Sequence, residues 1–209
     1  VADTVGYVVS SSFSADKIEQ QIITDLQAQL TDEQLQAVSE WYQTPVARKI
    51  SSAEIAASAP EAWPQIQASA PELNRKYKGT PKAEMFDRFD RAARATESAV
   101  DTTIAVQLGL ATAMSALSSE SMHYEQLERR IENQRGMLRG VVGQQVYDSY
   151  LYTYDKISAQ ELALYLDFLE SPAGKQFSQV VTSSIQQAIM EPVESIGRQI
   201  SRFMAPTLW

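Results

Sequence analysis

A short helical motif that occurs twice is the feature that most constrains what this chain can fold into. Residues 30–50 align without gaps to residues 157–177, so that Pro172 follows Pro45 by 127 residues. Few aligned positions are identical, but most agree in physical type. The two segments therefore predict the same local structure, and we interpret the offset as an internal duplication.

Each copy opens with the signals of a helix N-terminus. Thr31 and Ser158 are suitable N-caps, and Gln34 and Glu161 stand three residues later, where a capping box needs its second partner. An apolar residue precedes each cap and another occupies the fourth helical position, as in a hydrophobic staple: Leu30, Leu35, Ile157 and Leu162. A helix is therefore expected to begin at the same point of both copies.

Each copy then turns sharply at a proline. Pro45 and Pro172 disfavour helical geometry in the preceding Thr44 and Ser171, which can in turn cap a second helix. The second helix begins with small residues, Val46-Ala47 in one copy and Ala173-Gly174 in the other, which allow it to lie close to its neighbour. The motif therefore predicts a helix, a corner and a second helix.

The residues of the second corner also carry a family resemblance. The segment 168–175, Phe-Leu-Glu-Ser-Pro-Ala-Gly-Lys, follows a Ser-x-x-Glu helix start and resembles the bacterial domain-of-unknown-function family 2059. The first copy departs from this pattern after Pro45. The resemblance implies a small helical protein, exported to the periplasm or beyond in Gram-negative bacteria, with no established activity and no catalytic residue to transfer.

Apolar residues at helical spacing predict helices over most of the remaining chain. One is expected over residues 15–29, and a long one is expected from Thr80-Pro81 to about Ser118. Another passes through Leu127, Ile131 and Leu138, with a turn or loosened segment at the three glycines 136, 140 and 143. Residues 5–9 are the one candidate for a short extended piece. Prolines 60, 64 and 71 predict short helices or turns, and Pro192 predicts a kink or a new helix.

The expected fold is therefore an all-α helical bundle with an internally duplicated helical hairpin. We expect a single helical domain over residues 1–209, with related motifs at about 13–60 and 140–200 joined by a long central helical segment. Whether the two motifs share one core or form two lobes stays open. We favour one core, because the central segment is apolar enough to pack against both.

Composition excludes several classes of function. The formal net charge of −8 disfavours binding to nucleic acid, and the absence of cysteine excludes disulfides and thiolate sites. No run of about 18 apolar residues predicts a membrane span. The chain begins at Val1 rather than Met, so a removed signal peptide is one interpretation of its start.

Candidate chemistry is weak. Glu120 and His123 form a Glu-x-x-His element, but a di-iron bundle needs two such elements and the chain has one histidine, so no metal or cofactor is expected. Acids and arginines at i,i+4 spacing predict a solvated helix face with four ion pairs: Glu84–Arg88, Asp87–Arg91, Asp90–Arg94 and Glu125–Arg129. No nucleophile elbow or phosphate loop is present. We therefore predict that the chain is not an enzyme.

A stripe of tyrosines is the remaining candidate for binding. Tyr147, Tyr150 and Tyr154 recur at helical spacing, and such rings can line a pocket or simply form a buried helix face with hydroxyls at its edge. Two functions follow as hypotheses. The first is a non-catalytic module that binds another protein or itself. The second is a carrier of a small amphipathic ligand held between helices by Tyr147, Tyr150, Tyr154, Trp41 and Phe168.

Overall fold

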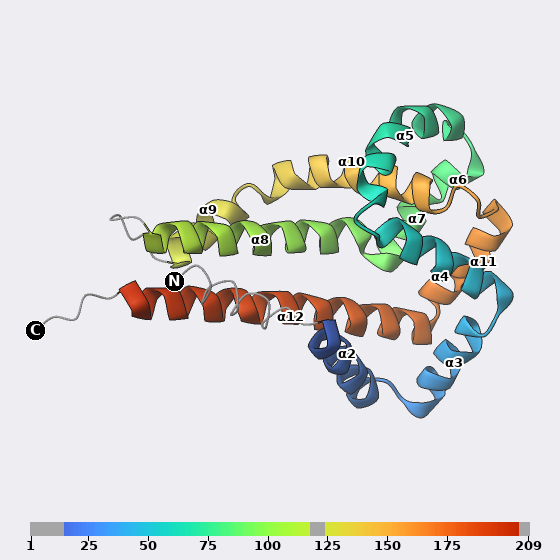
Figure 1. The fold of residues 1–209 in the computed structure, drawn as a ribbon. Helices are drawn as coiled ribbons and strands as arrows, with labels where there is room; N and C mark the ends of the chain where they lie inside the picture. The colour runs from blue at the N-terminus through green and yellow to red at the C-terminus, as the bar shows by residue number, and fades with distance from the viewer. Residues whose placement is uncertain (1–14, 118–123, 205–209) are drawn as a thin grey trace, which may run out of the picture.

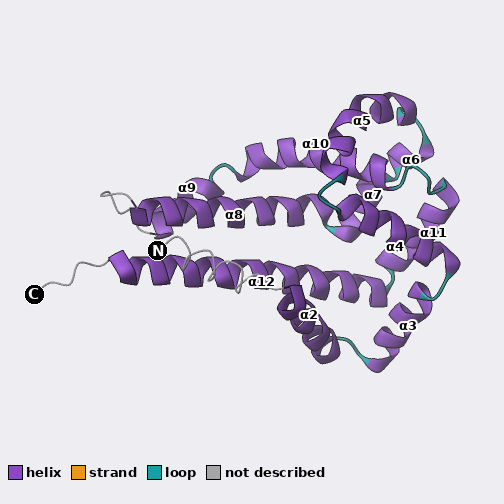
Figure 2. Ribbon diagram, viewed as in Figure 1, coloured by secondary structure: helices purple, strands orange, loops and turns teal. Residues whose placement is uncertain are grey.

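All the regular structure of the described chain is helical, which confirms the predicted all-α class. The computed structural model describes residues 15–117 and 124–204 (Figure 2). The helices are α2 (Ala15–Gln29), α3 (Asp32–Tyr42), α4 (Pro45–Ser58), α5 (Ala62–Tyr77), α6 (Pro81–Glu84), α7 (Phe86–Ala93), α8 (Ala95–Leu117), α9 (Tyr124–Glu132), α10 (Arg135–Thr153), α11 (Ala159–Glu170) and α12 (Pro172–Met204). The expected extended piece at residues 5–9 lies outside the described ranges.

The helices form a compact head and a long arm (Figure 1). The head contains α3 to α7, α11 and the adjoining ends of α10 and α12. Leu151, Leu162 and Leu166 lie in its apolar core. The arm consists of α8, α9 with the first half of α10, and the C-terminal half of α12. A smaller apolar cluster that includes Val100, Ile104 and Val142 holds the arm together.

The two predicted corners are built from equivalent contacts. In the first, the Thr44 hydroxyl donates to the Trp41 carbonyl at 2.7 Å and accepts from the Ala47 amide at 3.2 Å. In the second, the Ser171 hydroxyl donates to the Phe168 carbonyl at 2.5 Å and accepts from the Gly174 amide at 3.1 Å. Each hydroxyl thus closes one helix and opens the next, as the Ser/Thr-Pro signal predicts.

The corners differ in how closely the second helix approaches the first. Ala47 is 1% exposed in the first corner, whereas the equivalent position of the second is Gly174. A Cβ atom placed on Gly174 would lie 1.8 Å from the Phe168 carbonyl oxygen. The second corner is therefore too tight for any side chain at this position.

The helix starts of the two copies also differ in one contact. The Thr31 hydroxyl accepts from the Gln34 amide while the Gln34 side chain accepts from the Thr31 amide, which is a complete capping box. Ser158 accepts from the Glu161 amide at 3.1 Å, but the Glu161 carboxylate accepts from Lys49 of α4 at 2.9 Å. The predicted N-caps are thus both present, and the second copy uses its acid to join the copies.

The two copies of the motif pack against each other in a reciprocal way. By the 127-residue offset α2 matches the end of α10, and α4 matches the start of α12. The structure packs α2 against α12 and α4 against α10, so each copy places its first helix on the other's last helix. Trp41 stacks on Phe168, its own counterpart, with ring centroids 5.0 Å apart. This reciprocal pattern is what a twofold arrangement requires.

Three predicted interruptions do not end a helix in the described chain. Helix α10 continues through Gly136, Gly140 and Gly143, whereas the break expected there lies at residues 133–134, between α9 and α10. Pro192 lies inside α12, and Pro71 lies inside α5. Helices α10 and α12 both pack against α8, which offsets the weak local helix signals at the glycines and at Pro192.

The long helix predicted from Thr80 to Ser118 is wrong, since the chain breaks twice in this region. Thr80 and Pro81 begin a helix as expected, but α6 ends at Glu84 and α7 ends at Ala93. Arg94 adopts a left-handed backbone with φ of 51°. The Asp90 carboxylate accepts from the Thr96 amide at 2.7 Å and so caps the start of α8.

Candidate functional site

The structure brings the five predicted ligand residues into one row of touching aromatic rings. Trp41 lies between Phe168 and Tyr165, and Tyr165 contacts Tyr154 at 6.3 Å between centroids. Tyr154 and Tyr150 are 5.3 Å apart. The row reaches Tyr147 through further ring contacts: Tyr150–Tyr147, Phe86–Tyr150 and Phe86–Tyr147. Helical spacing predicted the tyrosine stripe, but only the fold joins it to Trp41.

The buried hydroxyls of this row have partners within the protein. The Tyr150 hydroxyl donates to the Lys82 carbonyl at 2.7 Å, and the Tyr154 hydroxyl donates to the Glu54 carboxylate at 2.7 Å. Burial raises the pKa of Tyr150 above its ordinary value. Burial, with the neighbouring Tyr165 and Glu54, holds the pKa of Tyr154 well above 10. Both side chains are therefore neutral structural members of the core at physiological pH.

A shallow hollow of about 480 Å³ opens beside the end of this row. It is lined by Tyr42, Ser51, Glu54, Ile55, Ser58 and Ala59. Burial, followed by the charge of Glu54, raises the pKa of Tyr42 to about 12. Of the five predicted ligand residues none lines this hollow, so their role in ligand binding stays a prediction.

A buried lysine that the sequence did not single out holds the C-terminal turn of α10. Lys82 is 7% exposed, and its ammonium donates to the Tyr154 carbonyl at 2.8 Å and lies 4.7 Å from the centre of the Tyr77 ring. Burial lowers the pKa of Lys82. A cation at a helix C-terminus stabilises the free carbonyl groups there, so this lysine has a structural task.

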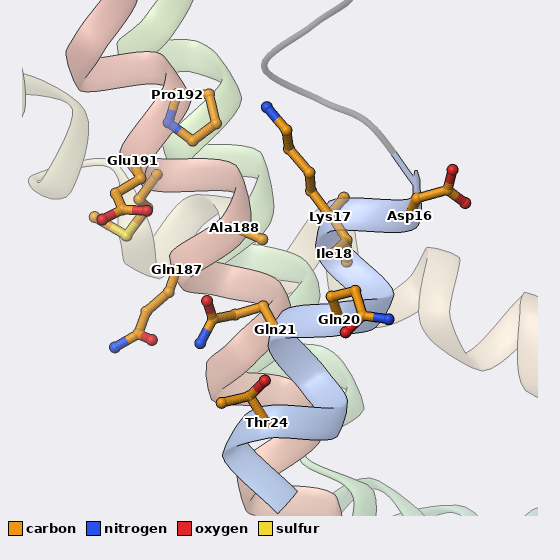
Figure 3. A pocket seen from close by; sticks show the side chains of 11 residues that line it. Asp16, Lys17, Ile18, Gln20, Gln21, Thr24, Gln187, Ala188, Glu191 and Pro192 are labelled. Carbon is orange, nitrogen blue, oxygen red and sulfur yellow. The ribbon is translucent and has the colours of Figure 1, made fainter.

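A hollow of about 890 Å³ lies between α2 and α12 (Figure 3). Its lining consists of Asp16, Lys17, Ile18, Gln20, Gln21 and Thr24 from α2, and of Gln187, Ala188, Met190, Glu191 and Pro192 from α12. Charges of both signs are mixed with apolar side chains, and this lining forms no recognisable catalytic set.

Apolar side chains are exposed along the arm. Val106, Leu110 and Met114 follow each other at four-residue spacing on α8 and are 48%, 62% and 71% exposed. Met137 and Val141 repeat this spacing on α10 and are 75% and 57% exposed. Exposed apolar side chains that repeat along a helix face are a feature of many protein contact sites. We call these five residues the arm stripe.

Of the four predicted i,i+4 ion pairs, only Glu125–Arg129 is found among the described residues, at 3.8 Å. Arg88 instead contacts two acids of α11, Asp167 at 2.8 Å and Glu170. Asp90 is used as the cap of α8. Arg88 and Asp90 therefore interact with neighbouring helices and not with the i,i+4 partners that their spacing predicts.

Glu120 and His123 lie outside the described residues. Within residues 15–117 and 124–204, no group of three or more His, Asp or Glu side chains is placed to hold a metal ion. None of the described helices combines the length and the apolar character that crossing a membrane requires.

A family model matches the first motif. A family model described as "Uncharacterized protein conserved in bacteria (DUF2059)" matches residues 16–76, from α2 to α5. No curated protein and no solved structure matches the chain. The match includes the Thr44-Pro45 corner, although the resemblance is more apparent in the second corner, which lies outside it. Residues 16–76 of this chain therefore carry the motif of the uncharacterised bacterial family DUF2059, the family that the sequence resembles.

Proposed function

We propose that the protein is a non-catalytic, exported helical module that binds another protein, or a second copy of itself, through the arm stripe. The observation that carries the proposal is the exposure of Val106, Leu110 and Met114 on one side of α8. An arrangement with four-residue spacing suits a partner that lays a helix or a groove along α8. Methionine adapts to irregular partner surfaces, and two of the five stripe residues are methionines.

The internal duplication belongs to the same proposal. Equivalent corners, reciprocal packing of α2 and α4, and the stack of Trp41 on Phe168 support a twofold arrangement of two copies within one chain. In such a chain the two copies of the motif already contact each other, as two separate chains would in a dimer. The exposed apolar residues of the arm are then available to a further partner.

Crosslinking in the source cells tests this function. A photo-reactive residue at position 110 should capture a partner, and adding Val106→Lys with Met114→Lys to this protein should abolish the capture without lowering the unfolding midpoint. Leu164→Lys is the matched control, because Leu164 is 51% exposed but lies on α11 in the head. The proposal fails if the protein is a strict monomer and no partner is captured, or if the control has the same effect. Fractionation of the source cells tests export.

A carrier of a small amphipathic ligand is the second candidate, supported by a hollow of about 220 Å³ in the arm. Apolar residues such as Ile104, Leu108 and Ile189 line it, and Arg135 and Asp101 place charges in its wall. An apolar hollow with a few polar groups is typical of small-molecule sites. Native mass spectrometry of protein purified from the source cells should detect the ligand, and the absence of any co-purifying molecule would exclude this candidate.

A further inference from the structure

A cationic hollow lies between α7 and α12, away from the arm stripe. It has a volume of about 270 Å³ and is lined by Arg91, Ala92, Ala93, Arg94, Lys175, Ser178, Gln179 and Thr182. Three of these side chains are positively charged, and none of the lining residues is acidic. The cations come from segments about 80 residues apart in a chain with net charge −8, which is why no basic run marks the site in the sequence.

The three cations lack acidic partners within the described ranges. Arg91, Arg94 and Lys175 form none of the ion pairs found in residues 15–117 and 124–204. The acid expected to pair with Arg94 is Asp90, and its carboxylate is held by the Thr96 amide at 2.7 Å. Among the residues that the structure describes, no carboxylate therefore lies within ion-pair distance of these three cations.

The backbone at Arg94 is a second, independent observation. Arg94 is the one non-glycine residue with positive φ in the described chain, and glycine would adopt this conformation without steric cost. Strained backbone conformations concentrate at functional sites, where the surrounding structure holds them. The C-cap of α7 is thus an arginine where glycine would be unstrained, and this arginine lines the hollow.

We propose that this hollow binds the phosphoryl group of a small phosphorylated molecule. Guanidinium groups match phosphate oxygens in geometry, a lysine adds charge, and the hydroxyls of Ser178 and Thr182 can donate hydrogen bonds. A phosphomonoester carries up to two negative charges, which suits three unpaired cations better than a single carboxylate does. The volume leaves room for a small organic group beside the phosphate. This site is separate from the proposed protein contact and does not depend on it.

Isothermal titration of the full chain at constant ionic strength, with inorganic phosphate and glycerol 3-phosphate as probes, tests the site. Both should bind saturably, with glycerol 3-phosphate at least as tight. Arg91→Gln and Lys175→Gln should each weaken binding about tenfold, the usual loss of one charged hydrogen bond. Arg48→Gln is the matched control, because Arg48 occupies in the first corner the position that Lys175 occupies in the second.

Arg94→Gly distinguishes loss of the site from loss of the fold. It should weaken phosphate binding while raising the unfolding midpoint, because it relieves the left-handed backbone. Absence of saturable binding would overturn the proposal, as would an Arg48→Gln variant that loses as much affinity as Lys175→Gln. Binding of inorganic phosphate with exclusion of glycerol 3-phosphate would overturn the assignment to an ester.

Discussion

Replacing Gly174 with alanine tests the tight second corner directly. The new Cβ would lie 1.8 Å from the Phe168 carbonyl oxygen, 2.7 Å from its carbonyl carbon and 3.0 Å from the Leu169 Cα, whereas ordinary contacts begin at 3.4 Å. All three atoms belong to the backbone of α11, so no side chain can rotate away. Helix α12 must therefore shift by more than 1 Å relative to α11, as estimated from these contacts.

The expected loss of stability follows from two opposing terms. Overpacking against a rigid neighbour costs about 3 kcal/mol, and alanine regains about 1 kcal/mol over glycine in a helix. The net loss of about 2 kcal/mol should lower the unfolding midpoint by roughly 4–8 °C in a chain of this size. Thermal unfolding followed by far-UV circular dichroism measures it.

Gly140→Ala is the matched control for this substitution. Gly140 lies in α10, and a Cβ there would meet nothing within 4 Å. The helix propensity term then acts alone, and the control should unfold up to a few degrees higher than the unmodified protein. A Gly174→Ala protein that unfolds at or above the midpoint of the unmodified protein would refute the close approach of the two helices.

Three further predictions concern hydrogen bonds and titration. Tyr154→Phe removes the hydroxyl that donates to Glu54 and should cost about 1–2 kcal/mol in urea unfolding, whereas an unchanged midpoint would show that the bond contributes nothing. The pKa of Tyr42 is raised to about 12 in the fold, so its contribution to stability is present below pH 10 and should be lost as the pH rises from 10 to 12, while tyrosinate absorbance appears. Burial would raise the pKa of Asp155, but bonds from Lys76 and Tyr77 lower it on balance. Its contribution is therefore present above about pH 4 and lost below, and Asp155→Asn should flatten the acid limb of the stability profile.

Local signals in the sequence predicted the parts of the fold that local contacts determine. Thr31, Ser158, Thr44 and Ser171 cap the helices that they were expected to cap, because each hydroxyl reaches an amide only three residues away. The boundary of α2 at Gln29 was also predicted from apolar spacing alone. These signals need no knowledge of the tertiary structure.

Contacts between distant segments account for what the sequence could not predict. Arg88 pairs with acids 79 and 82 residues away, so its expected partner Glu84 is not used. A left-handed arginine at position 94 has no sequence signal, since glycine or asparagine usually marks such a helix end. The cationic hollow was missed because its cations come from segments about 80 residues apart. The five aromatic residues chosen from the sequence as ligand residues pack in and against one core cluster, and their contacts with each other could be seen only in the fold.

The reciprocal packing of α2 on α12 and α4 on α10 has a consequence for how the chain folds during synthesis. The bonds Asp25–Ser184, Gln29–Gln176 and Glu54–Tyr154 span 159, 147 and 100 residues. At ribosomal speeds of about 5–20 residues per second, the second motif is synthesised on the order of ten seconds after the first. Until then the apolar faces of the first motif stay uncovered, so the newly made N-terminal half is expected to need a chaperone and to fold only after the C-terminal half has emerged.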